Sequence, residues 1–213
     1  MCKETFLRLP EEKRNRFLDA AWEEFTRVKF ADVSINQIVR RAGIPRGSFY
    51  QYFEGKEDLF RYLLNTAMKQ FAASYRKMMQ QAEGDLFRTQ LMCYDCFVER
   101  TSAEGPTFDR CIQLMRINPG MDIQKMMPER PAAELMEQTA AKMDLSRFRR
   151  TDTEFVWQVF VLALLALGSA IMDSLTHPED AAEHRRRLSA QMEIIQWGSM
   201  RAESMLAPEE EEV

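Results

Sequence analysis

The side chains best suited to recognition chemistry lie between residues 34 and 56, in the stretch SINQIVRRAGIPRGSFYQYFEGK. Its charged residues are Arg40, Arg41, Arg46 and Lys56, with a single acid, Glu54. Arginine can pair with guanine edges and glutamine with adenine edges, whereas lysine and tyrosine hydroxyls typically hold phosphates. The stretch predicts a surface for an anionic partner, although the whole chain has a formal net charge of −4.

Two short helices joined by a glycine turn are expected to position these side chains. Ser34 and Gln37 have the spacing of a capping box, which predicts that the first helix begins at Ser34. Gly43 supplies the turn, and Pro45 begins the second helix, with Phe49 and Phe53 facing inward. This pattern is typical of a helix-turn-helix unit, whose second helix enters the DNA major groove. The alternative is that the same side chains are solvated residues on a small three-helix unit.

The rest of the chain also favours helices, so the expected fold class is all-α. Pro10 begins a helix that runs to about residue 29, and a longer helix covers about residues 56–82. The last two helices, about residues 152–175 and 179–206, are joined by a short link that favours an antiparallel pair.

The stretch AGIPRGSFYQYFEGKEDLF, residues 42–60, resembles the recognition-helix signature of the TetR family of bacterial transcriptional regulators. The signature is a glycine turn, a Gly-Ser/Thr-aromatic-Tyr-x-Tyr/His-Phe helix and a Lys-Glu-x-Leu start to the next helix. The match covers about residues 10–65. The resemblance implies a helix-turn-helix DNA-binding domain at residues 1–55 and a helical ligand-binding and dimerisation domain at residues 56–213. It also implies a homodimer that binds a palindromic operator and is released as a repressor by a small effector.

The resemblance assigns roles to the matching positions of this sequence. Phosphate contacts are expected from Ser34, Gly47, Ser48, Tyr50 and Lys56, and base readers are expected at Arg46, Gln51 and Tyr52. The chain departs from the pattern at Pro45, where many relatives carry a hydrogen-bond donor, so one contact is in doubt.

An apolar or amphipathic effector is expected to bind among the central helices of the second domain, where methionines are frequent. The candidate lining residues are Phe71, Tyr75, Tyr94, Phe97, Met115, Trp157 and Val161. Asp95 and Arg116 could hold a charged group of the ligand, or they could be exposed or paired within the protein.

The cysteines allow three interpretations. Cys93 and Cys96 form a Cys-x-x-Cys on an expected helix, and Cys111 lies on the next one. Core packing, thiol redox sensing and metal binding all remain open, but structural zinc prefers four ligands and only three cysteines lie near one another. No metal or other cofactor is expected, and a disulfide is not expected in a reducing compartment.

The sequence lacks features that are expected of exported proteins, membrane proteins and enzymes. There is no export signal at the N-terminus, which predicts a cytoplasmic protein. The apolar run at residues 155–172 is at the lower limit for a membrane span, and its polar flanks favour a helix that protein buries on nearly all sides. No phosphate loop, histidine-based dyad or carboxylate pair indicates an enzyme. A redox-sensing regulator and a ligand-independent DNA-binding protein remain the alternatives.

Overall fold

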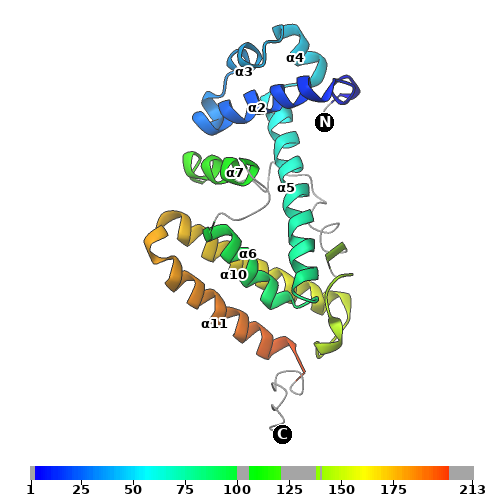
Figure 1. Cartoon of the computed structure of the whole chain (residues 1–213), viewed down its shortest axis with the longest axis vertical. Helices are drawn as coiled ribbons and strands as arrows, with labels where there is room; N and C mark the ends of the chain where they lie inside the picture. Colours follow the sequence, from blue (N-terminus) through cyan, green and yellow to red (C-terminus); the bar gives the residue numbers. More distant parts are fainter. Residues whose placement is uncertain (1–2, 100–105, 121–137, 140, 202–213) are drawn as a thin grey trace. The chain divides into compact units, whose positions relative to one another are not determined.

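The computed structural model describes residues 3–99, 106–120, 138–139 and 141–201 (Figure 1). The described residues are helical, apart from loops and an isolated antiparallel bridge between Phe148 and Met200. The expected all-α class is therefore confirmed. The chain divides into two compact units, Met1–Phe71 with Glu104–Pro131 and Ala72–Ala103 with Ala132–Val213. These units are defined by packing, whereas the division at residue 55 concerns function and stays a prediction.

The first unit is a bundle of short helices around the beginning of a long one. Its elements are α1 (Glu4–Leu7), α2 (Glu11–Arg27), the 3-10 helix η1 (Phe30–Asp32), α3 (Ile35–Ala42), α4 (Arg46–Tyr52), the first part of α5 (Lys56–Gln81) and α7 (Pro106–Ile117). Pro10, Ser34 and Pro45 each stand directly before a helix, close to the starts expected from the sequence. The short helix α1 was not expected.

Aromatic rings form the centre of the first unit. Phe6, Phe17, Phe49 and Phe53 are all buried. The rings of Phe17 and Phe53 stack with 5.8 Å between centroids and an interplanar angle of 6°. Burying such large rings from α1, α2 and α4 around one point fixes these helices against one another.

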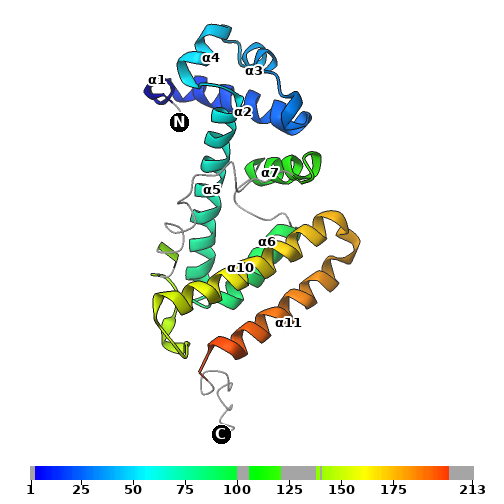
Figure 2. The same ribbon diagram turned by 180° about the vertical axis from the view of Figure 1, so that it is seen from behind.

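The second unit is built on two long helices that run side by side in opposite directions (Figures 1 and 2). They are α10 (Thr153–Thr176) and α11 (Ala181–Ser199), joined by the 3-10 helix η3 (Pro178–Asp180). The antiparallel pair expected from the short link is confirmed. Helix α6 (Leu86–Glu99) packs against both of them, and a further 3-10 helix, η2 (Leu145–Arg147), precedes α10.

A buried polar network joins α6, α10 and α11. The Tyr94 hydroxyl donates to the Ala181 carbonyl at 2.8 Å and lies 2.7 Å from the Ser174 hydroxyl. The same Ser174 hydroxyl lies 3.0 Å from His184 Nδ1. Because the Tyr94 hydrogen is used by Ala181, Ser174 donates to Tyr94 and His184 Nδ1 carries the hydrogen for Ser174. No local sequence pattern indicates this network, because its members come from three different helices.

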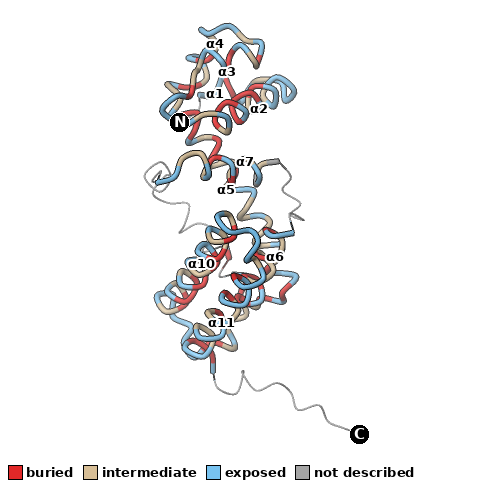
Figure 3. Tube along the Cα trace, turned by 90° about the vertical axis from the view of Figure 1, so that its left-hand side faces the viewer, coloured by how far each residue is buried: buried red, intermediate tan, exposed pale blue. Residues whose placement is uncertain are grey.

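Helix α10 is the helix among the described residues that is long and apolar enough to cross a membrane, as the core helices of other proteins also are. Only 33% of its apolar window is buried within the single chain. The single chain therefore does not bury this helix on nearly all sides, and its burial in an assembly stays a prediction. The physical reason is that α6 and α11 cover one face, while Leu162, Leu165 and Met172 remain 52%, 65% and 46% exposed (Figure 3).

Candidate nucleic-acid interface

The turn between α3 and α4 has the geometry that the sequence predicted. Gly43 has φ +65° and ψ +36°, the left-handed region that glycine enters without steric cost. Its amide donates to the Arg40 carbonyl, and the Ile44 amide donates to the Val39 carbonyl, so the turn closes the end of α3. The turn brings α4 across α3, in the arrangement of a helix-turn-helix unit.

Helix α4 has a buried side and an exposed side. Phe49 is fully buried in the first core, as expected. Arg46, Tyr50 and Gln51 are exposed, and Tyr50 keeps 43% of its surface accessible. These three side chains offer a guanidinium, a hydroxyl and an amide on one short helix, a set that can contact both phosphates and base edges.

Gly47 lies on the exposed side of α4 and needs no special backbone conformation. A Cβ placed on Gly47 would meet no atom within 4 Å. The fold itself therefore gives no reason for glycine here, and glycine within a helix destabilises it relative to alanine. An open backbone at this position allows close approach by another molecule.

Ser48 and Tyr52 are less accessible than their neighbours on α4. Both are only partly exposed. The Tyr52 ring lies 5.6 Å from the Phe6 ring and 6.1 Å from the Phe17 ring, between centroids. The ring of Tyr52 therefore belongs to the first core, and its role as a base reader stays a prediction.

A buried carboxylate holds α3 against α2. The side chain of Glu24 is 1% exposed, and its Oε2 accepts hydrogen bonds at 2.8 Å from both Arg27 and Arg41. Its Oε1 accepts from the Ser34 amide at 3.3 Å. Burial raises the pKa of Glu24, but the hydrogen bonds from Arg27 and Ser34 and the charges of Arg27 and Arg41 outweigh it, so the pKa lies below its ordinary value. Arg41 is thus committed within the protein, while Arg40 is exposed.

The expected capping box at Ser34 is wrong, although Ser34 does stand before the first residue of α3. Its side chain makes no capping hydrogen bond. In a capping box, the Gln37 side chain would reach back to the Ser34 amide. That amide already donates to Glu24, so Gln37 has no group to satisfy and is exposed.

Lys56 is held by the first unit itself. Its Nζ donates to the Phe30 carbonyl at 2.9 Å and to the Ala31 carbonyl at 2.7 Å, and lies 5.2 Å from the centroid of the Phe30 ring. The amine therefore fastens η1 to the start of α5. Its role as a phosphate contact stays a prediction.

The N-terminal residues satisfy the last carbonyl groups of α4. Lys3 donates from its backbone amide to the Tyr52 carbonyl and from Nζ to the Tyr50 carbonyl, both at 2.9 Å. The Thr5 hydroxyl donates to the Gln51 carbonyl at 2.6 Å. Helix ends leave such carbonyls without intrahelical partners, so these contacts stabilise the seven-residue helix. No local sequence pattern indicates Lys3 and Thr5 as partners of α4, because their acceptors lie 46 to 49 positions along the chain.

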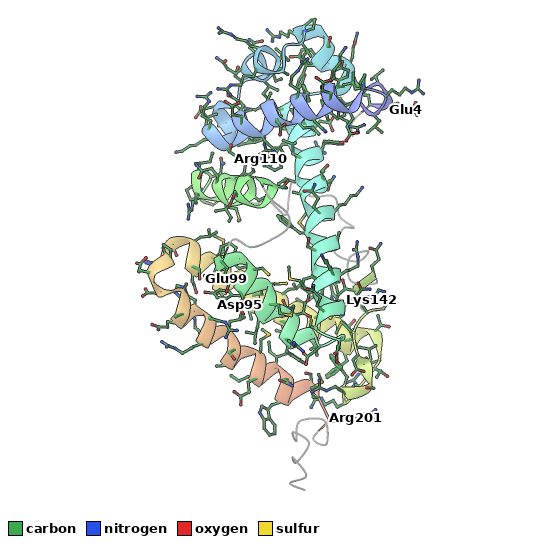
Figure 4. All side chains as sticks on the ribbon, in the orientation of Figure 1. Glu4, Asp95, Glu99, Arg110, Lys142 and Arg201 are labelled. Atoms are coloured by element: carbon green, nitrogen blue, oxygen red, sulfur yellow. The ribbon has the colours of Figure 1, made fainter. Side chains whose placement is uncertain are left out.

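Helix α7 is attached to α2 and η1 within the first unit. Arg110, labelled in Figure 4, donates from Nη2 to Asp19 Oδ1 at 2.8 Å. The Phe30 amide donates to Asn118 Oδ1 at 2.8 Å. A pocket of about 290 Å³ lies between α2, α5 and α7, with Trp22 and Arg110 in its lining. None of the seven expected effector residues lines this pocket among those the structure describes.

The expected effector residues are divided between the two units. Phe71 and Met115 belong to the first unit. The second unit holds Tyr75, Tyr94, Phe97, Trp157 and Val161. Tyr94 and Phe97 are buried, at 1% and 7% exposure. Asp95 is paired within the protein, since it accepts from Arg185 Nε at 2.6 Å and Nη2 at 2.8 Å, whereas Arg116 is exposed.

The described cysteines are partly buried thiols that lie in different units. Cys93 donates to the sulfur of Met78 at 3.4 Å. Cys93 and Cys96 are in the second unit and Cys111 is in the first. Cys2 lies outside the described residues. The choice between packing and redox sensing stays open. The group of side chains in the described part that could hold a metal, His177, Glu179 and Asp180, contains no cysteine and is exposed.

Residues 17–63 match a family model described as bacterial regulatory proteins, TetR family. The HTH-type transcriptional regulator SrpR of Pseudomonas putida is 41% identical over 54 residues, which is 25% of this chain and 25% of SrpR. The first curated relatives are matched over only 25% to 40% of their own length.

Solved structures of low identity share the fold over most of the chain. SmeT, the repressor of the Stenotrophomonas maltophilia multidrug efflux pump SmeDEF, has a TM-score of 0.61 at 18% identity, covering 94% of this chain and 95% of SmeT. NalD, the secondary repressor of the MexAB-OprM multidrug efflux pump in Pseudomonas aeruginosa, has a TM-score of 0.56 at 23% identity, covering 90% of this chain and 98% of NalD. SmeT has also been solved in complex with triclosan.

Proposed function

We propose that this chain, which belongs to the TetR family of bacterial regulatory proteins through residues 17–63, is a DNA-binding transcriptional repressor released from a palindromic operator by a small effector. The observation that carries the proposal is the exposed side of α4, which holds Arg46, Tyr50 and Gln51 around an open glycine backbone. The second unit is the proposed effector-binding and dimerisation part. In this proposal the protein acts by binding, without catalysis, in the cytoplasm.

The proposed DNA contacts follow the accessibility of the side chains. Arg46 and Gln51 read base edges in the major groove, with Arg46 facing guanine and Gln51 facing adenine. Ser34, Ser48, Tyr50 and the backbone at Gly47 contact phosphates. Lys56 can contribute a phosphate contact only through its third ammonium hydrogen, since two hydrogens are donated to carbonyl groups.

Binding to two kinds of DNA tests the assignment. The first is a duplex that the wild-type protein selects from a random-sequence library, and the second is a scrambled duplex of the same composition. Gln51→Ala and Arg46→Ala should each weaken binding to the selected duplex by about 1–3 kcal/mol and relax the preference at particular base pairs. Tyr50→Phe should give a smaller loss that is equal on both duplexes. If the first two variants weaken both duplexes equally, α4 does not read sequence.

The proposed homodimer rests on the exposed apolar faces of α10 and α11. Leu162, Leu165 and Met172 recur at helical spacing on α10, and Ile194 and Trp197 are 72% and 65% exposed on α11. Neighbouring α10 and α11 therefore present an apolar surface that a second copy can cover, giving a four-helix interface. A Cβ at Gly168 or Gly198 would meet no atom within 4 Å, so both positions leave room for a partner helix.

Sedimentation at micromolar concentration tests the dimer. The wild type should have about twice the chain mass of 25.0 kDa. Leu165→Glu should shift the protein to the monomer, because it places a charge in an apolar interface. Leu7→Glu is the matched control, since Leu7 is 53% exposed in the other unit. A monomeric wild type would overturn the proposal.

The proposed effector is an apolar or amphipathic molecule that lowers DNA affinity on binding. The triclosan complex of SmeT, which shares the fold, supports a molecule of this kind. Coupling of this sort is typically about 1–3 kcal/mol. Triclosan itself is a suitable first probe in a thermal-shift assay, because a ligand that binds the folded state raises the unfolding temperature. A ligand that stabilises the protein and leaves DNA affinity unchanged would contradict the effector role.

A further inference from the structure

One buried side chain of the second unit has only part of its hydrogen-bonding capacity satisfied. Gln90 on α6 is completely buried, with an exposed fraction of 0%. Its Nε2 donates to the Tyr75 hydroxyl on α5 at 2.9 Å. Its Oε1 is the buried side-chain polar atom that lacks a hydrogen-bond partner among the described residues. A buried group left in this state costs about 1–3 kcal/mol.

Reversing the amide does not remove the problem. If Oε1 and Nε2 exchange places, Oε1 accepts from Tyr75 and the NH2 group is left without a partner. In the orientation described, the Tyr75 hydroxyl accepts from Gln90 and has its own hydrogen to donate. Among the described residues, the hydrogen bond from Gln90 is the one this hydroxyl makes. The pair therefore offers one unused acceptor and one unused donor side by side.

The Tyr75 hydroxyl keeps its hydrogen at all ordinary pH values. Burial raises the pKa of Tyr75 far above its ordinary value of 10.0, the nearby Cys93 thiol adds to this, and the hydrogen bond from Gln90 only partly opposes it. The pair is therefore electrically neutral. A charged ligand would find no countercharge in it, whereas a neutral polar group loses little on burial when both its hydrogen bonds are made.

Apolar and sulfur-containing side chains surround the pair. The Tyr75 ring packs edge-on against the Phe160 ring of α10 at 6.1 Å, and Trp157 stacks on the same ring at 6.4 Å, between centroids. Met78 and Met79 lie three and four residues after Tyr75, on the same side of α5. Methionine side chains are flexible and re-pack readily, so this wall can adapt to an apolar body.

Tyr75 is the more accessible residue of the pair. Gln90 is fully buried, but Tyr75 and Trp157 are only partly buried. The pair thus lies directly beneath side chains at the edge of the second core.

We propose that the Tyr75–Gln90 pair is the polar anchor of the effector site, and that it takes a neutral molecule with an apolar body and one hydroxyl group, a phenol or an alcohol. One hydroxyl fits both unused groups, because its oxygen accepts from Tyr75 and its hydrogen is donated to Gln90 Oε1. The apolar body lies against the methionines of α5 and the aromatic rings of α10. The effector role of the bound molecule rests on the proposed function, but the binding site itself can be tested without DNA.

The test compares two probes that differ only in the hydroxyl, 4-propylphenol and propylbenzene, by calorimetric titration of the full-length protein. The hydroxyl preference is the Kd of propylbenzene divided by the Kd of 4-propylphenol. Gln90→Leu should lower this preference by roughly tenfold, since it removes the hydrogen-bonding partner. Tyr75→Phe should lower it by a smaller factor. Binding of propylbenzene should change little in either variant.

Stability separates this role from a structural one. Gln90→Leu should leave the unfolding temperature unchanged or raise it, because it replaces an unsatisfied polar group by an apolar one. Gln90→Met is the second variant if leucine disturbs the packing. Thr89→Val is the matched control, since the buried Thr89 hydroxyl on the same helix donates within the protein, with contacts to the Asp85 carbonyl and the Met79 sulfur. It should leave the hydroxyl preference as it is.

Four outcomes separate failure of this binding site from failure of the proposed function. A hydroxyl preference that is equal in the wild type and Gln90→Leu would mean that an internal water, or nothing, satisfies Gln90. The proposed site would also be wrong if the wild type bound neither probe up to the solubility limit of that probe. If 4-propylphenol binds through Gln90 and DNA affinity is unchanged, the site stands and the proposed effector role fails. If effectors release DNA and their binding is insensitive to Gln90→Leu, the proposed function stands and this anchor is wrong.

Discussion

Replacing Gly47 by alanine should stabilise the free protein and weaken its binding to DNA. Gly47 is the second residue of α4, and a Cβ there meets no atom within 4 Å. Glycine inside a helix is destabilising by about 0.5–1 kcal/mol relative to alanine. Because Gly47 is close to the start of the helix, we expect a gain in stability near the lower end of this range. For a chain of this size, about 0.5 kcal/mol raises the unfolding temperature by about 1–2 °C.

The effect on DNA binding should have the opposite sign. A methyl group at Gly47 occupies the space in which the backbone of α4 is proposed to approach a phosphate. Losing a hydrogen bond to a charged group costs about 1.5–3 kcal/mol, or roughly tenfold or more in Kd for each half-site. No charge is removed, so the slope of affinity against salt concentration should not change.

Gly43→Ala is the matched control. Gly43 has φ +65°, and an alanine in this left-handed conformation costs about 1–2 kcal/mol. It should therefore lower both stability and DNA affinity. Thermal unfolding followed by circular dichroism, together with fluorescence anisotropy on the selected duplex, separates the two variants. If Gly47→Ala destabilises the protein as Gly43→Ala does, or binds DNA as well as the wild type, the reasoning about the open backbone fails.

Three further substitutions test the contacts that support α3 and α4. Glu24→Gln should lower the free energy of unfolding by about 1–3 kcal/mol at neutral pH, measured in urea, because it removes the negative charge that pairs with two arginines and turns one of the two acceptor oxygens into a donor. The pKa of Glu24 is lowered in the folded chain, so its contribution is present above the unfolded pKa and is lost as the pH falls through the folded pKa. The difference between wild type and variant should therefore disappear in acid; a difference independent of pH would contradict this. Lys3→Met should destabilise the protein by about 1 kcal/mol and weaken DNA binding, and unchanged DNA affinity would argue against support of α4 by Lys3. Lys56→Met should lower the unfolding temperature, because Nζ holds two carbonyls of η1, and an unchanged temperature would mean that these contacts contribute nothing.

The amino-acid composition of α10 predicts that the helix is buried, but it does not predict which face is buried or by which residues. The apolar run of α10 indicates that the helix must be covered, but it does not say by what. Within one chain only a third of its window is buried, and Leu165 is 65% exposed. Which face is covered depends on where α6 and α11 pack, and among the described residues the remaining face of α10 is exposed.

The local features of the candidate interface were predictable from the sequence alone. Pro10 and Pro45 mark helix starts because proline fixes φ and lacks the amide hydrogen that a helix start leaves unused. Gly43 marks the turn because only glycine enters the left-handed region without cost. Phe49 and Phe53 face inward because their spacing of four places them on one side of the chain. Each of these rules acts over a few residues.

The contacts that fix these helices in place were decided only by the tertiary structure. Glu24 is a buried ligand of Arg41, 17 residues away, and it takes over the Ser34 amide that a local capping box would have used. Lys3 caps the end of α4 across 47 residues, and Lys56 turns to carbonyls 25 and 26 residues before it. A charged side chain has the same local pattern whether it lies in water or against a distant carbonyl. Its partner is set by which helices pack together, because burial makes an unpaired charge too costly to leave.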